Sequence, residues 1–121
     1  LDLMLLITDN KFEDSTQAAL KLYAKADLLA FQNRTDAAIK ILDDVLIQHK
    51  GTTIEDQALY KQAKLLETKN EFAKAEINYL NIITNYKEDL LADDAYFALA
   101  ELYEKQFEGI KSIQKKLNNG L

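Results

Sequence analysis

Apolar residues recur every three or four positions along almost the whole chain, which is the spacing of helices that bury one face. Polar and turn-forming residues interrupt this pattern at regular intervals. The pattern predicts six helices, which cover residues 16–32, 34–49, 54–69, 71–86, 90–106 and 108–117. Alternation of apolar and polar residues lasts only a few positions at a time, so the chain is predicted to be all-α.

Short polar residues and one glycine mark the predicted helix ends. Asn33 and Asn70 are expected to cap the helices that follow them, because the side-chain oxygen of Asn accepts a hydrogen bond from a free N–H at a helix start. Gly51 follows the helix 34–49 and is expected to adopt the left-handed conformation that ends many helices. The spacing of these helix-end residues groups the helices into pairs.

The helix pairs repeat with a period of 37 residues. Equivalent positions of the first helices hold Ala26, Ala63 and Ala100, and positions twelve residues later hold Ala38, Ala75 and Ser112. Two antiparallel helices approach closely where the residues between them are small. A repeat of this length indicates a solenoid of stacked helix pairs.

This pattern resembles the tetratricopeptide repeat, in which apolar, small and aromatic residues recur at fixed steps through two helices. The second repeat matches the family's steps with Leu59, Ala63, Leu66, Asn70, Phe72, Ala75 and Tyr79. The first repeat matches with Leu22, Ala26, Leu29, Asn33, Ala38 and Leu42. The third matches in its first helix with Tyr96, Leu99, Ala100 and Tyr103, but Gly109 and Lys116 replace the expected aromatic residues of its second helix. The chain departs from the family in its longer period and in lacking Pro and Trp.

The resemblance implies an all-α, right-handed superhelix of three helix pairs that follow a partial leading helix. The single domain would divide into a partial upstream repeat (1–15), repeat 1 (16–51), repeat 2 (52–88) and a repeat 3 with a degenerate second helix (89–121). A start at Leu1 rather than Met leads us to expect a fragment of a longer protein. The apolar segment Leu1–Ile7 is expected to pack as a helix; alternatively, it pairs with another copy in a homodimer through exposed ends.

A further likeness concerns the source of the chain. The segments Tyr23–Asn33 and Leu91–Glu104 are similar to the C-terminal repeats of larger bacterial proteins of this family. Those proteins act in outer-membrane assembly and related envelope systems. This resemblance implies a location in the periplasm or cell envelope.

Composition excludes several classes of function. The chain has no Cys and one His, so neither a thiolate metal site nor a site with two imidazoles can form within it. It lacks a Gly-rich phosphate loop, and its apolar runs, such as Leu3–Ile7, are far too short to span a membrane. The net charge of −5 disfavours nucleic acid. We therefore expect a non-catalytic chain without cofactor or metal, in which Asp43-Asp44 and Asp93-Asp94 have structural roles.

The family resemblance also implies a concave groove lined by the first helix of each pair. The residues expected to contact a partner there are Tyr23, Asp27, Phe31, Tyr60, Lys64, Phe97, Glu101 and Lys105. Over the wider face of fifteen positions, five acidic residues outnumber two lysines: Asp27, Glu67, Asp94, Glu101 and Glu104 against Lys64 and Lys105. This excess favours a neutral or basic, partly apolar peptide or protein partner. Two interpretations stay open: the aromatic rings bind a peptide, or they only pack against the neighbouring repeat and the chain is a structural spacer or self-association element.

Overall fold

The computed structural model describes the backbone of residues 2–88 and 90–120 and the side chains of residues 15–88 and 90–120. This part of the chain contains helices and turns but no strand, which confirms the all-α prediction. Within it, five helices follow one another: α1 (Asp2–Phe31), α2 (Thr35–Gln48), α3 (Glu55–Thr68), α4 (Phe72–Asn85) and α5 (Leu90–Asn119).

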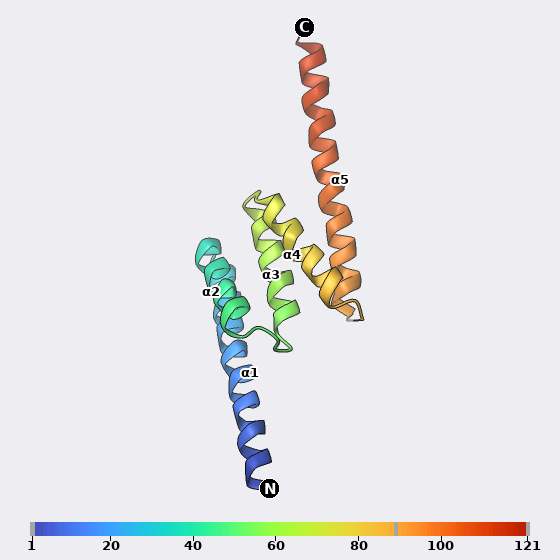
Figure 1. Cartoon of the computed structure of the whole chain (residues 1–121). Coiled ribbons are helices and arrows are strands. Elements are labelled where there is room, and N and C mark those ends of the chain that lie inside the picture. Colours follow the sequence, from blue (N-terminus) through green and yellow to red (C-terminus); the bar gives the residue numbers. More distant parts are fainter. Residues whose placement is uncertain (1, 89, 121) are drawn as a thin grey trace.

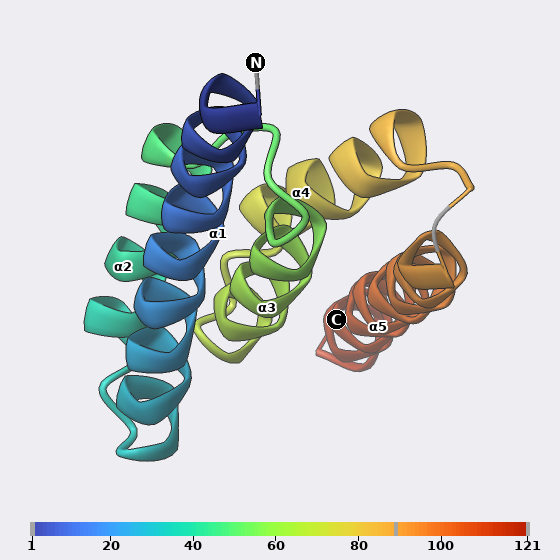
Figure 2. The same ribbon diagram turned by 90° about the horizontal axis from the view of Figure 1, so that it is seen from below.

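The helices alternate in direction and pack mainly against their neighbours in the chain (Figure 1). α1 and α2 form one antiparallel hairpin, α3 and α4 form a second, and α5 packs against α4. α1, α3 and α5 lie in a row from left to right in Figure 2. The first half of α1 and the second half of α5 extend beyond the other helices at opposite ends of the molecule.

The buried apolar side chains form two clusters in series. The first joins α1, α2 and the start of α3 through Ala19, Ala26, Leu42, Val45, Ile54 and Ala58. The second joins α3, α4 and α5 through Leu59, Ala63, Leu66, Ala75, Tyr79, Ile82, Ala95, Ala98, Leu99 and Leu102. α3 contributes to both clusters and Leu46 packs against both, so each helix is supported by its neighbours rather than by a common centre.

The tight turns inside the two hairpins have the same backbone geometry. Asn33 and Asn70 have φ values of 62° and 60°, in the left-handed region. The N–H of Arg34 bonds to the carbonyl of Leu29 at 2.8 Å, and the equivalent bond joins Glu71 to Leu66 at 2.9 Å. This is the Schellman arrangement, which satisfies free carbonyls at a helix end.

These turns correct an expectation about the helix starts. The asparagines end α1 and α3, while Arg34 and Glu71 are the N-terminal cap residues of α2 and α4 and make no side-chain capping bond. Asn suits this position because its short polar side chain tolerates the left-handed conformation better than other residues with a Cβ. Gly51, with φ of 84°, has the predicted left-handed conformation after α2.

The small residues of the repeat pattern are buried in both hairpins but not in α5. Ala26 and Ala38 are fully buried in the first hairpin, and Ala63 and Ala75 are fully buried in the second. Their equivalents Ala100 and Ser112 are exposed, which contradicts the packing role predicted for them. Both lie on the single helix α5, so within the described residues no second helix folds back over Ala100.

The third helix pair is therefore wrong as predicted, because residues 90–106 and 108–117 belong to the single helix α5. The position equivalent to Asn33 and Asn70 is Phe107, a bulky residue for which the left-handed conformation is costly. Gly109 lies inside α5, two residues beyond that position. The described chain thus has two helix pairs and a long fifth helix.

The start predicted at Thr16 is also wrong, because α1 continues back to Asp2. The position equivalent to Gly51 is Asp14, a residue that the helix accommodates, and it lies within α1. The expectation that the apolar side chains of Leu1–Ile7 pack or pair with another copy falls outside the residues whose side chains are described.

Candidate functional site

An open hollow of about 350 Å³ lies where α1, α3 and α5 meet. Its lining consists of Tyr23 from α1, of Asp56, Gln57 and Tyr60 from α3, and of Leu90, Leu91 and Asp94 from α5. The fold brings these residues together because the first turn of α5 returns to the start of α3. Two residues predicted for the groove, Tyr23 and Tyr60, therefore share one hollow.

Both tyrosines also take part in helix packing. Tyr23 is half-buried against the first core cluster, and this burial raises the pKa of its hydroxyl, while nearby Lys61 lowers it and Asp27 raises it further. The ring of Tyr60 meets the buried ring of Tyr79 edge-on, with centroids 5.9 Å apart. The rings are thus held in place and present only part of their surface to the hollow.

Two other predicted residues lie towards the far end of α1. Asp27 forms an ion pair with Lys61 of α3, which joins the two hairpins across this face. Phe31, at the last position of α1, is 86% exposed. Both line a second hollow of about 560 Å³, together with Ala24, Leu28, Ala30 and Lys61.

The remaining predicted residues lie further along α3 and α5. The ammonium of Lys64 lies 5.5 Å from the centroid of the Tyr60 ring and 3.9 Å from the carboxylate of Glu67. Phe97 is 68% exposed on α5. Glu101 and Lys105 line a third hollow, of about 430 Å³, with Glu104 and Glu108. The eight predicted residues are therefore spread along one side of three helices, and only the two tyrosines line the central hollow.

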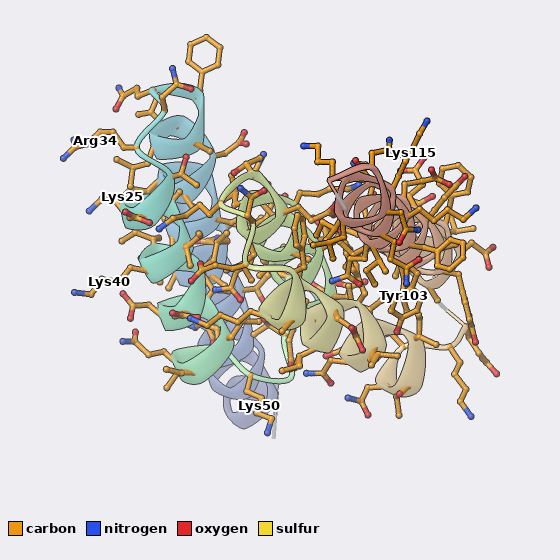
Figure 3. All side chains as sticks on the ribbon, turned by 90° about the horizontal axis from the view of Figure 1, so that it is seen from above. Lys25, Arg34, Lys40, Lys50, Tyr103 and Lys115 are labelled. Atoms are coloured by element: carbon orange, nitrogen blue, oxygen red, sulfur yellow. The ribbon has the colours of Figure 1, made fainter. Side chains whose placement is uncertain are left out.

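Carboxylates dominate the charge of the central hollow. Asp56 is only 5% exposed and accepts a hydrogen bond of 2.9 Å from the backbone N–H of Gln57. Asp94 is exposed at the first turns of α5. Figure 3 shows Lys25, Arg34, Lys40 and Lys50 along the α1–α2 side of the molecule, where they project away from the other helices. These basic groups do not offset the acidic lining.

A polar network that sequence reasoning missed lies between α2, α3 and α4. The side-chain amide of Gln62, a 4% exposed residue, donates to the carbonyl of Ile39 at 3.1 Å and to the carboxylate of Asp43 at 2.6 Å. Its oxygen accepts a bond of 2.8 Å from Asn78, which also donates to the Leu59 carbonyl. The network fixes the second hairpin against α2 and gives Asp43 a structural partner.

A second buried polar contact joins α4 to the last turn of α3. The hydroxyl of Tyr79 donates to the carboxylate of Glu67, whose side chain is 12% exposed. Burial, followed by this hydrogen bond, raises the pKa of Tyr79 well above its usual range. The neutral hydroxyl is therefore the stable form, and it anchors α4 to α3.

The structure also places Ser15 beside His49, a pair that lies 34 positions apart in sequence. The hydroxyl oxygen and Nδ1 are 3.3 Å apart, longer than an ordinary hydrogen bond from a hydroxyl. Among the residues described, no cluster of three metal-ligating side chains is found. Nor, within the same residues, is any helix apolar and long enough to cross a bilayer.

Comparison of this chain with protein-family models, with curated proteins and with solved structures yields no match. Its function is therefore inferred from its own residues. The two surface features that can contact a partner are the acidic hollow with its two tyrosines and the exposed second half of α5.

Proposed function

We propose that this chain is a non-catalytic protein-interaction module that binds a neutral or basic, partly apolar peptide segment in the hollow between α1, α3 and α5. The observation that carries this proposal is the lining of the hollow. Tyr23 and Tyr60 provide aromatic surface, Leu90 and Leu91 provide aliphatic surface, and carboxylates lie beside them. The resemblance to tetratricopeptide repeats, which commonly bind peptides along their first helices, points in the same direction.

The lining suits a Lys or Arg side chain better than an acidic one. The aliphatic stem of such a residue can lie on a tyrosine ring, and its charged end can reach Asp94. Because Tyr23 and Tyr60 are already held by core packing, binding would order few side chains in the module itself. A volume of about 350 Å³ accommodates one or two side chains, so the peptide would extend along the row of helices.

A tetratricopeptide-like superhelix is part of the same proposal. It is supported by two hairpins in series, by Schellman turns 37 residues apart, and by core clusters that follow the order of the chain. Such an arrangement presents the first helices side by side, and an extended segment can contact several of them at once.

The test measures the binding of short fluorescein-labelled peptides by fluorescence anisotropy. The peptides share flanking Leu residues and carry Lys, Arg, norleucine or Glu at the centre. We expect the Lys and Arg peptides to bind most tightly. The variant Gln57→Arg adds bulk and positive charge to the hollow and should weaken binding about tenfold or more. Asn81→Arg makes the same kind of change at an exposed position on α4 and should not weaken it.

A second pair of variants separates the hollow from general surface charge. Asp94→Asn should weaken binding of the Lys peptide about threefold to fivefold, as expected for a partly exposed ion pair. Asp93→Asn removes the same charge from the adjacent exposed position and should have less than about half that effect on the binding free energy. Equal losses in the two variants, or binding unaffected by Gln57→Arg, would refute the peptide-binding role.

A second candidate function is self-association without a peptide ligand, as a spacer element of a larger protein. A specific observation favours it: α5 exposes Tyr96, Phe107, Ile110, Ile113 and Leu117. Failure of every peptide to bind, combined with association of the chain with itself, would favour this alternative.

A further inference from the structure

The outer half of α5 is not covered by any other element of the described chain. All side chains from Phe107 to Gly120 are exposed, and this half of the helix extends beyond α4 in Figure 1. It nevertheless carries large apolar residues: Phe107, Ile110, Ile113 and Leu117 are 56%, 54%, 60% and 63% exposed. Contiguous apolar surface of this kind marks a site of interaction.

These side chains continue a stripe that begins on the inner half of α5. Tyr96 and Tyr103 are 59% and 44% exposed, and steps of three, four or seven residues lead from them to the outer side chains. Such steps return to one side of a helix. The α5 stripe comprises Tyr96, Ala100, Tyr103, Phe107, Ile110, Ile113 and Leu117. Its length is about 32 Å at a rise of about 1.5 Å per residue.

The two hairpins indicate what would cover the inner half of this stripe. Ala26 and Ala63, the equivalents of Ala100, are fully buried in clusters to which the second helix of each hairpin contributes. Over the range that the structure describes, α5 has no such partner helix because it does not turn at Phe107. An antiparallel helix from outside the chain would take that place.

The distribution of charge along α5 indicates which helix would fit against its stripe. Residues 90–105 carry four acidic residues and one lysine, a net charge of −3, whereas residues 106–119 carry three lysines and one acidic residue, a net charge of +2. Lys115, one of these lysines, projects outward from α5 (Figure 3). A second α5 in antiparallel alignment places each acidic half against a basic half, while parallel alignment opposes like charges.

We propose that two copies of this chain associate through their α5 stripes, antiparallel and related by a two-fold axis near Phe107. Tyr96 of one copy then faces Leu117 of the other, and Tyr103 faces Ile110. The footprint, about 32 Å long and one helix of about 10 Å wide, is smaller than the roughly 800 Å² per partner of a stable complex. The dimer therefore dissociates on dilution. This inference does not depend on the peptide-binding hollow.

Sedimentation equilibrium of the full chain tests the association. The mass should rise from monomer towards dimer between about 5 µM and about 500 µM. Ile113→Asp places a charge in the stripe and should keep the chain monomeric over that range. Ile77→Asp makes the same change at a 63% exposed position on α4 and should leave association unchanged. A monomer at every concentration, or equal effects of the two variants, overturns the proposal.

A charge-reversal series tests the antiparallel alignment. Glu104 and Lys111 lie seven residues apart on the same flank of the stripe, so each Glu104 lies about two residues along the helix from the position opposite Lys111 of the other copy, within reach of its long side chain. Glu104→Lys and Lys111→Glu should each weaken the dimer about fivefold or more because like charges then oppose, and the double variant should restore it. Additive weakening in the double variant contradicts the alignment.

Cross-linking provides an independent check because the chain contains no other Cys. Phe107→Cys lies near the axis and should form a disulfide-linked dimer on oxidation, since the two Cα atoms must come within about 7 Å. Leu117→Cys should cross-link poorly with itself but well with Tyr96→Cys. Efficient self-cross-linking at position 117 would indicate a parallel pair and overturn the proposal.

Discussion

The contact between Tyr79 and Glu67 offers a direct test of what holds the second hairpin together. Among the side chains described, Tyr79 is the largest that is fully buried, and its hydroxyl donates to a carboxylate that is itself 12% exposed. Tyr79→Phe removes this hydrogen bond and keeps the edge-on contact with Tyr60. The variant therefore isolates the hydroxyl from the packing of the ring.

The size of the effect follows from the charge and burial of the acceptor. A hydrogen bond to a charged group contributes about 1.5–3 kcal/mol to the free energy of unfolding. Glu67 keeps the ammonium of Lys64 at 3.9 Å and some contact with water, which places the loss at the lower end, about 1.5 kcal/mol. Tyr79→Ala also removes the ring and should cost about 3–5 kcal/mol. For a domain of this size, 1.5 kcal/mol lowers the melting temperature by roughly 6 °C.

Urea unfolding followed by circular dichroism gives these free energies. The control is Tyr96→Phe, which removes the same hydroxyl from a 59% exposed side chain and should change stability by less than about 0.5 kcal/mol. A double-mutant cycle with Glu67→Gln measures the coupling between the two groups. If Tyr79→Phe costs no more than Tyr96→Phe, or the cycle shows no coupling, the hydroxyl does not anchor the hairpin.

Four further outcomes are expected. The folded-state pKa of Tyr79 is raised above its unfolded value near 10, so its hydroxyl contributes fully to the free energy of unfolding below about pH 10, and this contribution is lost as the pH rises further. Unfolding free energies measured up to pH 11.5 should therefore fall more steeply in the wild type than in Tyr79→Phe. Asn70→Ala should cost about 1 kcal/mol in urea unfolding because Ala disfavours the left-handed turn, whereas Asn70→Gly should cost nothing. Gln62→Leu should cost about 1–3 kcal/mol by leaving the Asp43 carboxylate and the Ile39 carbonyl without this donor, and a smaller loss than that of an exposed control would refute the network's importance. Gly109→Ala should stabilise helix α5 by about 0.5–1 kcal/mol, since nothing lies within 4 Å of the added Cβ, and the gain should be visible as higher unfolding free energy or higher helix content by circular dichroism. A decrease in both quantities would contradict a continuous α5.

The middle of the fold follows closely from the apolar pattern. The predicted helices 34–49, 54–69 and 71–86 differ from α2, α3 and α4 by one residue at each end. Their buried faces recur at helical spacing, and turn-forming residues stop them on both sides. Where pattern and turn residues agree, local sequence is enough to set the bounds of a helix.

The outer helices show where this reasoning fails. Periodicity alone cannot tell two helices from one, and the distinction depends on whether the residue between them accepts a turn. Asn33 does and Phe107 does not, although the two occupy equivalent positions. The repeat predicts a third hairpin. However, similarity between repeats does not by itself determine whether the residue at the turn can adopt the backbone conformation that the turn needs.

The candidate site was predictable only in part. Tyr23 and Tyr60 follow from the register of the first helices, and both line the central hollow. Leu90 and Leu91 do not follow, because the path of the link between α4 and α5 brings them there. Gln62 and Asn78 gave no signal, since a buried amide looks like a surface residue until its partners on other helices are known.

The two serial core clusters have a consequence for how the chain opens. α3 contributes to both, whereas the last turns of α5 touch neither. In deuterium exchange, amides of α3 should be the slowest and those beyond Phe107 among the fastest, with α2 and α4 in between. Local unfolding would then spread inward from the two outermost helices, and α3 would unfold last.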